Sequence, residues 1–386
     1  MRDAVIVSAV RSPIGKRKGS LAGMHSVDLS AAVLNALAEK GGIDPSVVDD
    51  VMWGCVGQTG EQASNIARNA VLSAGWPESV PGTTIERQCG SSQQAIHFAA
   101  ATVMSGMSDV VVAGGVENMT SIPLGTARRQ GPGDPFSEQL LSRYGGVELN
   151  QGLGAEMLAA RYGLSRQWLD ELSLESHARA AAAQDAGHFD AEIAPIALAG
   201  GVFGQDEGIR RGSSMEKLGE LDPVFREDGV VTAGNASQVS DGSSAVLVMT
   251  SERAAELGLT PLVRVHAATV VGDDPVSMLA APAPATAKVL KLAGLSLADI
   301  GTFEMNEAFA SVVGAWLTET GADRALVNPD GGAIALGHPL GGSGARLATT
   351  LIHRMVRDEV RYGLHTMCEG GGMANATIYE NLRLGS

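Results

Sequence analysis

The order of apolar and polar positions along the chain predicts strands that alternate with helices. Apolar residues recur at helical spacing over residues 29–40, 93–104, 167–184, 286–293 and 346–355. Short apolar runs typical of strands cover residues 51–56, 109–113 and 364–367. Because strands and helices alternate, we predict an α/β fold with a mainly parallel sheet and helices covering its faces.

This pattern occurs twice. One segment begins at Gly42 and the other at Gly294, and each follows a helical run and leads into a short apolar strand. A glycine-rich turn, a helix and a strand then follow in both parts of the chain. The sequence therefore predicts two copies of one unit, stacked into a single layered body.

The region between the copies has a different composition. It contains a polar, glycine-rich stretch and amphipathic helices, with little strand character. We predict an inserted domain over residues 118–237, an N-terminal half made of residues 1–117 and 238–261, and a C-terminal half over residues 262–386. Long insertions often carry binding function, and a purely structural excursion is the alternative.

Length and charge exclude several classes of protein. The 386 residues exceed the usual size of one hydrophobic core, and the net charge of −15 argues against a nucleic acid or an anionic membrane as partner. No run approaches the roughly 18 apolar residues of a membrane-spanning helix, and the apolar start at residues 4–7 is too short for a signal peptide. We expect a cytoplasmic protein.

The three cysteines are too few and too scattered for a disulfide framework or a metal site. Each is expected to be a free thiol in a reducing compartment. Cys55 lies in an apolar strand-like run and is interpreted as a small buried residue. Cys89 lies between a strand-like run and a helix, where N–H groups and the helix dipole favour a thiolate nucleophile. A buried structural cysteine is the alternative at that position.

Further candidates lie where glycine-rich loops follow apolar segments. His338 lies in the loop 331–339, whose rigid backbone is more typical of a site than of a core, and an imidazole can take a thiol proton near neutral pH. Cys368 ends a strand and could act as an acid or base, and the glycines after it, such as Gly370, could line an oxyanion site. Asn306 could hold a water or an oxyanion, or be an ordinary loop amide.

Taken together, these motifs resemble the thiolases. The segments that carry the resemblance occur in the family's order and spacing, at residues 10–16, 88–91, 114–119, 234–237, 306–309, 337–339 and 368–370. The similarity spans essentially the whole chain and is closest in character to degradative and sterol-catabolic thiolases of the actinobacterial type. It implies the thiolase fold, with two duplicated βαβαβαββ-type halves stacked in five layers and an inserted loop domain. It also implies a homodimer or homotetramer.

The resemblance implies a role for each candidate. Cys89 would be the acylated nucleophile, His338 the base that activates it, and Cys368 the acid and base at the acetyl α-carbon. One oxyanion site would combine His338 with a water held by Asn306, and the other would use the N–H groups of Cys89 and Gly370. The implied reaction cleaves a 3-ketoacyl-CoA with coenzyme A to acetyl-CoA and a shortened acyl-CoA, and reverses as a Claisen condensation. Coenzyme A is then a substrate, and neither a metal nor a permanently bound cofactor is expected.

The same resemblance predicts contacts for coenzyme A. Ser237 would meet the pantetheine arm and Arg210 the nucleotide phosphates, unless Arg210 is a solvated surface charge. Gln151 and Phe309 complete the predicted set. Many thiolases carry methionine where this chain has Gln151, and Cys-Gly-Ser-Gly where it has Cys-Gly-Ser-Ser. These differences favour a degradative enzyme for fatty-acid or sterol-derived acyl groups over a biosynthetic acetoacetyl-CoA thiolase.

Three other classes of protein fit the sequence less well. A decarboxylating ketosynthase would pair its cysteine with two histidines, or a histidine and an asparagine, and would not need the second thiol at Cys368. A non-catalytic acyl-CoA or lipid carrier would have lost at least one reactive group, and all three are present. A dinucleotide-binding oxidoreductase would need Gly-x-Gly-x-x-Gly after a strand, and the sequence has none in that setting.

Overall fold

The two halves repeat one order of main elements, namely strand, helix, strand, helix, helix, strand and strand, and each half adds short elements of its own. A computed structural model describes residues 2–384. The first half consists of β1 (Val5–Arg11), β2 (Gly15–Lys16), α1 (Ser26–Gly41), β3 (Asp50–Gly54), α2 (Ile66–Ser73), β4 (Gly82–Ile85), α3 (Ser91–Ser105), β5 (Val110–Asn118) and β8 (Ser240–Met249). The second consists of β9 (Val263–Gly272), α10 (Pro282–Ala293), β10 (Thr302–Met305), α11 (Ala310–Thr320), α12 (Ala333–Leu336), α13 (Leu340–Arg357), β11 (Tyr362–Glu369) and β12 (Met373–Asn381). Helices α1 and α10 both end at a left-handed glycine, Gly42 (φ 63°) and Gly294 (φ 69°), so the predicted duplication is confirmed.

The sheet is mixed, so the prediction of a mainly parallel sheet was wrong. Its strands follow the order β10-β11-β12-β9-β1-β8-β5-β3-β4, with β2 beside β8. Among the described strands only β3–β4, β3–β5 and β10–β11 are parallel pairs. The turn at residues 370–372 is too short for a crossover, which makes β12 antiparallel to β11. Strand β8 enters after the inserted segment and runs antiparallel to both β1 and β5.

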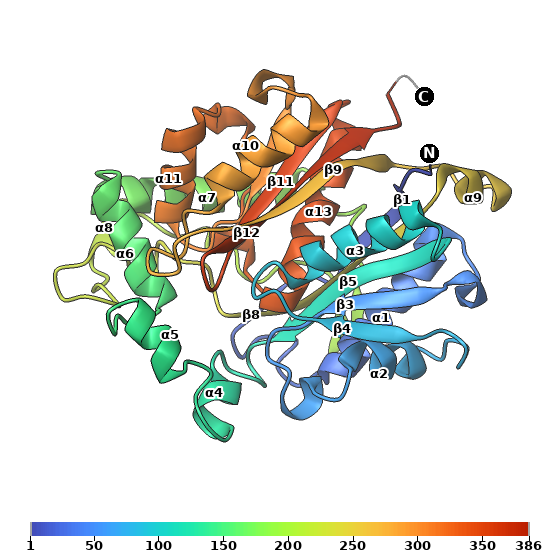
Figure 1. Cartoon of the computed structure of the whole chain (residues 1–386), viewed down its shortest axis with the longest axis horizontal. Helices are drawn as coiled ribbons and strands as arrows, with labels where there is room; N and C mark the ends of the chain where they lie inside the picture. The colour runs from blue at the N-terminus through green and yellow to red at the C-terminus, as the bar shows by residue number, and fades with distance from the viewer. Residues whose placement is uncertain (1, 385–386) are drawn as a thin grey trace.

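Three apolar cores divide the body into five layers, which confirms the expected architecture. Helices α1 and α2 cover one face of the N-terminal strands over a core that includes Leu34 and Trp53. Helices α3 and α13 fill the middle, between the strands of the two halves. Helices α10 and α11 cover the outer face of the C-terminal strands, where Phe303 packs on Trp316 at 5.5 Å. Figure 1 shows α10 and α11 on one side of the molecule and α1 and α2 on the other.

The middle layer depends on close backbone contact. Helix α13 is buried along most of its length and begins with several glycines. A Cβ atom at Gly341 would lie 2.6 Å from Cys55 Cα and from the carbonyl oxygen of Val116, so a side chain cannot fit there. The Ala345 N–H donates to Ser92 Oγ at 2.9 Å, which ties the start of α13 to the start of α3. The two helices therefore begin side by side.

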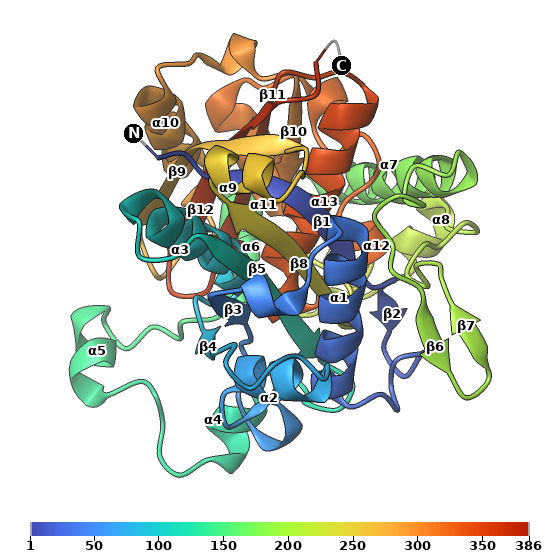
Figure 2. The same ribbon diagram turned by 90° about the vertical axis from the view of Figure 1, so that its right-hand side faces the viewer.

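The inserted segment lies between the end of β5 and the start of β8. It contains α4 (Thr126–Gln130), α5 (Glu138–Arg143), α6 (Gln151–Arg161), α7 (Arg166–Asp185), the hairpin of β6 (Ile196–Leu198) and β7 (Gly201–Phe203), and α8 (Met215–Gly219). Figure 2 shows α4 and α5 projecting from the layered body. Helix α9 (Ser251–Glu256) joins the halves. Over residues 2–384, no helix is long and apolar enough to span a membrane.

Candidate active site

Cys89 lies in a tight turn between β4 and α3. The preceding residue, Gln88, has a φ of 48°, which is uncommon for a residue with a side chain and occurs often at functional sites. Ser91 holds the turn, because its Oγ accepts from the Arg87 N–H at 2.9 Å and donates to the Gln88 carbonyl at 2.6 Å. Cys89 is 3% exposed, and Gly90 is the N-cap of α3. The turn therefore fixes the thiol at the start of the helix.

Burial dominates the ionisation of Cys89. Burial, and then the charge of Glu369, raises the pKa of the thiol to about 12. The backbone N–H of Cys89 and a hydrogen bond from the Gln151 side chain lower the pKa, but by less. This differs from the sequence-based expectation of a stabilised thiolate, because the thiol is deeper than its position before a helix indicated. Cys89 is a neutral thiol at rest and needs a base.

His338 lies in the short connection between α12 and α13. Part of the loop expected over residues 331–339 forms helix α12 instead. The Asn306 side-chain amide lies 3.3 Å from His338 Nε2, and Ser343 Oγ lies 2.6 Å from Nδ1. Burial, and then the positive charge of Arg346, lowers the pKa of His338 to about 3. The imidazole is therefore neutral at physiological pH.

The hydrogen bonds of Ser343 assign the tautomer of His338. Its hydroxyl donates to the Pro339 carbonyl at 2.8 Å. A hydroxyl has only one hydrogen to donate, so Ser343 Oγ accepts from Nδ1–H of His338. The lone pair is then on Nε2, which accepts from Asn306. Nε2 is the nitrogen that can take a proton.

Cys368 lies at the end of β11 and is 1% exposed. Burial raises its pKa well above the usual thiol value, and interaction with the ionised form of Cys89 is the next largest cause. The two thiols therefore lie within electrostatic range of each other, although they come from different halves. Gly370 follows this strand end and borders the side chains of Gln88 and Gln151.

The predicted catalytic residues form two close pairs, Cys89 with Cys368 and His338 with Asn306. Cys89 packs in one small apolar cluster with Leu340, two residues after His338, and with Met367, the residue before Cys368. The structure thus places Cys89 near Cys368 and His338 near Asn306. The cluster of Cys89, Leu340 and Met367 joins the backbone segments that carry Cys89, His338 and Cys368. Cys55 is fully buried in the N-terminal core as a free thiol, as expected.

Two of the residues predicted to contact coenzyme A share a cavity. Arg210 and Ser237 line a space of about 530 Å³ together with Lys16 and Arg17. The Ser237 N–H donates to the Ala308 carbonyl at 2.9 Å, so Ser237 lies next to the residue that precedes Phe309. The cavity combines three positive charges with one carboxylate, that of Glu207, and a hydroxyl, and this excess of positive charge suits a phosphate-bearing ligand.

Phe309 and Gln151 do not line this cavity. Phe309 is buried and meets Phe225 edge to face, with ring centroids 6.1 Å apart. Gln151 begins α6 and lines a second cavity of about 510 Å³ with Gln88 and Gly370. The apolar lining of that cavity includes Phe136, Leu149, Met278 and Met373. Gln151 is therefore grouped with the Cys89 thiol and not with Arg210 and Ser237.

Sequence reasoning missed two buried residues at the site. Ser343 contacts His338, and Glu369 acts on the pKa of both Cys89 and Cys368. Ser343 follows His338 by five residues, a spacing that could have indicated a contact on the first turn of a following helix. The sequence offers no comparable signal for the burial of Glu369.

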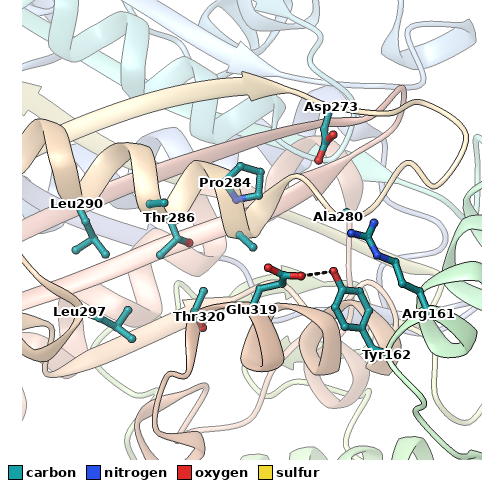
Figure 3. Close-up of a pocket in the computed structure, with 12 residues that line it drawn as sticks. Arg161, Tyr162, Asp273, Ala280, Pro284, Thr286, Leu290, Leu297, Glu319 and Thr320 are labelled. Carbon is teal, nitrogen blue, oxygen red and sulfur yellow. Dashed lines mark hydrogen bonds between the residues drawn. The ribbon is translucent and has the colours of Figure 1, made fainter.

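A third cavity lies apart from these residues (Figure 3). It has a volume of about 480 Å³ and is lined by parts of α6, α10 and α11. Across it, the Tyr162 hydroxyl donates to Glu319 at 2.7 Å. None of the predicted site residues lines it. Within the described part of the chain, no group of three or more histidine, cysteine or acidic side chains is arranged to hold a metal ion.

Comparison with known proteins identifies the family. Residues 4–252 match the thiolase N-terminal domain and residues 259–381 the thiolase C-terminal domain. The chain is 51% identical to the steroid 3-ketoacyl-CoA thiolase FadA6 of Mycobacterium tuberculosis, over 99% of this chain and 95% of that protein. It is 46% identical to a 3-ketoacyl-CoA thiolase of Escherichia fergusonii, over 99% of this chain and 100% of that protein.

A solved structure agrees with this result. The crystal structure of the Bacillus anthracis acetyl-CoA acetyltransferase superposes with a TM-score of 0.91, at 40% identity and over 99% of both chains. The match includes both duplicated halves and the inserted segment, because it covers nearly the whole of each chain. This chain belongs to the thiolase family of acyltransferase enzymes.

Proposed function

We propose that this enzyme cleaves 3-ketoacyl-CoA with coenzyme A, giving acetyl-CoA and a shortened acyl-CoA. The observation that carries the proposal is the pair of buried thiols, Cys89 and Cys368, which lie within electrostatic range of each other. A nucleophile and a separate acid and base are the groups that a carbon–carbon cleavage next to a thioester requires. The neutral imidazole of His338 supplies the third group.

The first half-reaction begins at Cys89. His338 Nε2 takes the thiol proton, and the thiolate attacks the C3 carbonyl of the substrate. The bond between C2 and C3 then breaks, and its electron pair passes to C2 of the departing acetyl-CoA. Cys368 gives its proton to that carbon. The shortened acyl group remains on Cys89 as a thioester.

The second half-reaction restores the enzyme. The Cys368 thiolate takes the proton of the incoming coenzyme A thiol, which attacks the acyl carbonyl on Cys89. The Cys89 thiolate leaves and recovers the proton held by His338. Charge that develops on carbonyl oxygens would be stabilised by His338 with a water held by Asn306, and by the N–H groups of Cys89 and Gly370. Each step uses only these groups, so we propose coenzyme A as a substrate and no permanently bound cofactor.

The two cavities suit different parts of the acyl-CoA substrate. The cavity with Arg210 and Ser237 suits the phosphates and pantetheine of coenzyme A. Phe309 lies near this cavity, because Ser237 is hydrogen-bonded to the residue before Phe309. The cavity with Gln151 borders Gly370 and has four apolar side chains beside polar ones such as Glu86 and Arg87, so its apolar part suits the acyl group. We propose a degradative enzyme for bulky fatty-acid or sterol-derived acyl groups, in line with the name of the relative that is 51% identical. A biosynthetic acetoacetyl-CoA thiolase is the alternative.

We also propose that the enzyme self-associates. Hydrophobic side chains on and just after α3 are exposed, namely Phe98, Met104 and Met107, the last at 82%. Burying such a surface against a second copy would stabilise a homodimer or homotetramer. Sedimentation analysis tests this. We further propose a cytoplasmic location, which fits the three free thiols.

The decisive experiment is coenzyme A-dependent cleavage of 3-ketoacyl-CoAs that range from acetoacetyl through long-chain to ring-bearing acyl groups, followed as acetyl-CoA formation. Cleavage of the larger members is expected, and cleavage of acetoacetyl-CoA alone would favour the biosynthetic alternative. Cys89→Ala should abolish both cleavage and covalent acylation. Cys368→Ala should still be acylated by an activated thioester, detected by mass spectrometry. Equal acylation of wild type and Cys89→Ala would show that the nucleophile is another residue.

A further inference from the structure

A buried carboxyl group lies beside the two thiols. Glu369 directly follows Cys368 at the end of β11 and is fully buried. Its Oε1 atom lies so close to Gly90 that a Cβ atom at that glycine would overlap it. Gly90 is the residue after Cys89 and caps α3. The carboxyl group of Glu369 therefore lies next to the proposed nucleophile, Cys89, and next to the proposed acid and base, Cys368.

Glu369 lacks the partners that a buried carboxylate usually has. Within residues 2–384, no protein group hydrogen-bonds its Oε2 atom, and Asn375, with its amide nitrogen turned toward the carboxyl group, donates to Oε1. A buried negative charge with so little compensation is costly, and the group keeps its proton instead. Burial accordingly raises the pKa of Glu369 to about 8.

The charged groups around Glu369 do not reverse this effect. Arg87, from the turn before α3, lowers the pKa of Glu369, and Glu86 beside it raises it. His97, which faces Arg87 from α3, is uncharged, because burial lowers its pKa to about 3. Cys89 and Cys368 are both neutral at rest. The buried Glu117 also raises the pKa of Cys89, but by less than Glu369 does.

A negative charge at Glu369 would oppose the reaction. It is the second largest cause, after burial, of the raised pKa of Cys89, and it also raises the pKa of Cys368. A permanently ionised Glu369 would therefore hinder formation of both thiolates. A neutral carboxylic acid at the same position removes this repulsion and leaves the N-terminus of α3 free to stabilise the Cys89 thiolate.

We propose that Glu369 acts through Cys89 as a neutral carboxylic acid, and that loss of its proton in alkaline solution slows formation of the Cys89 thiolate. This inference rests on the proposed role of Cys89 as the nucleophile. Glu369 is a positioning residue in this scheme, since it sets the charge around the thiol without contacting the reacting atoms of the substrate.

The test measures the rate at which iodoacetamide alkylates Cys89 in the full-length enzyme, with the modified residue located by mass spectrometry. Glu369→Gln keeps the shape of the side chain and cannot ionise. Near pH 6.5 the two proteins should react at similar rates. Toward pH 9.5 Glu369→Gln should react up to about tenfold faster, because a shift of about one pKa unit changes the thiolate population about tenfold. A rate ratio that stays constant with pH would overturn the proposal, since a purely structural role predicts that result.

Arg87 offers a second variant if Glu369→Gln does not fold. Arg87→Gln removes the charge that lowers the pKa of Glu369, so the alkaline slowing should begin at higher pH, whereas Arg87→Lys should leave it unchanged. An unchanged onset in Arg87→Gln would count against the proposal. Infrared spectra should also show a protonated carboxyl band at neutral pH that disappears in alkaline solution. Alkylation needs no substrate, so failure of the 3-ketoacyl-CoA panel with an intact pH effect would reject the proposed function and not the role of Glu369.

Discussion

The Nδ1 atom of His338 lies 2.6 Å from the Oγ atom of Ser343, and that hydroxyl donates its only hydrogen to the Pro339 carbonyl. The contact therefore keeps a hydrogen on Nδ1 and the lone pair on Nε2. Without it the imidazole could adopt the other tautomer, in which Nε2 carries a hydrogen and cannot accept the Cys89 proton. Ser343 thus selects the form of His338 that can act as a base.

Ser343→Ala should lower kcat by about 10- to 100-fold, because a buried imidazole N–H left without an acceptor costs about 1–3 kcal/mol. The KM for coenzyme A should change little, since Ser343 lies away from the cavity of Arg210 and Ser237. Steady-state kinetics checks both parameters. Ser311→Ala is a matched control, because Ser311 is also buried but its hydroxyl has no partner among the described residues. An equal loss of kcat in both variants would show that Ser343 does not select the tautomer of His338.

Arg210→Ala should raise the KM for coenzyme A by about tenfold, which corresponds to about 1.4 kcal/mol of lost phosphate binding. The kinetics with a pantetheine substrate, which lacks the nucleotide, should not change. Arg211→Ala is the control, because the Arg211 side chain pairs with Asp185 and does not line the cavity. If Arg210→Ala weakens both substrates equally, Arg210 does not bind the nucleotide part.

Gln151→Met should shift the preference of the enzyme toward short acyl groups. The methionine would fill part of the cavity beside Gly370 and replace a polar group with an apolar one. A change of this size in an apolar pocket is worth about 1–3 kcal/mol, or about 10- to 200-fold in selectivity. The quantity to measure is the ratio of kcat/KM for acetoacetyl-CoA to that for a long-chain substrate. This ratio cancels any general effect of losing the hydrogen bond from Gln151 to Cys89. An unchanged ratio would place the acyl group in another cavity.

Acid should destabilise the protein partly through His177. Burial, and then the charge of Arg210, lowers the pKa of this histidine to about 4 in the folded state. Between about pH 6.5 and pH 4 the unfolded chain therefore binds a proton at His177 that the folded protein does not, and the free energy of unfolding falls as pH falls. His177→Gln should reduce this slope by up to about 1.4 kcal/mol per pH unit. Urea unfolding at several pH values measures the slope. Equal slopes in wild type and His177→Gln would contradict the prediction.

Much of the fold was predictable because its signals are local. The glycines after α1 and α10 and the repeated order of elements identified the duplication before any contact was known. The direction of β8 was not predictable in this way, since it depends on how the inserted segment returns the chain to the sheet. Pairing between distant strands leaves no mark in a window of neighbouring residues.

The positions of the reactive groups were predictable for a similar reason, whereas their ionisation was not. Cys89, Cys368 and Asn306 each follow a strand-like run, and strand ends tend to gather at one edge of a sheet. The pKa of Cys89 depends instead on its depth below the surface and on Glu369, which comes from the other half of the chain. Gln151 was expected among the contacts for coenzyme A, and its position beside Cys89 depends on where α6 packs.

The glycine-lined contact between α3 and α13 has a consequence for how the duplicated chain can come apart. A tandem repeat often allows one copy to melt while its neighbour survives. Here the two copies share a single inner layer, and detaching either would open the apolar faces of both to water. We therefore expect the two halves to unfold in one cooperative transition, and either half expressed alone to be unstable.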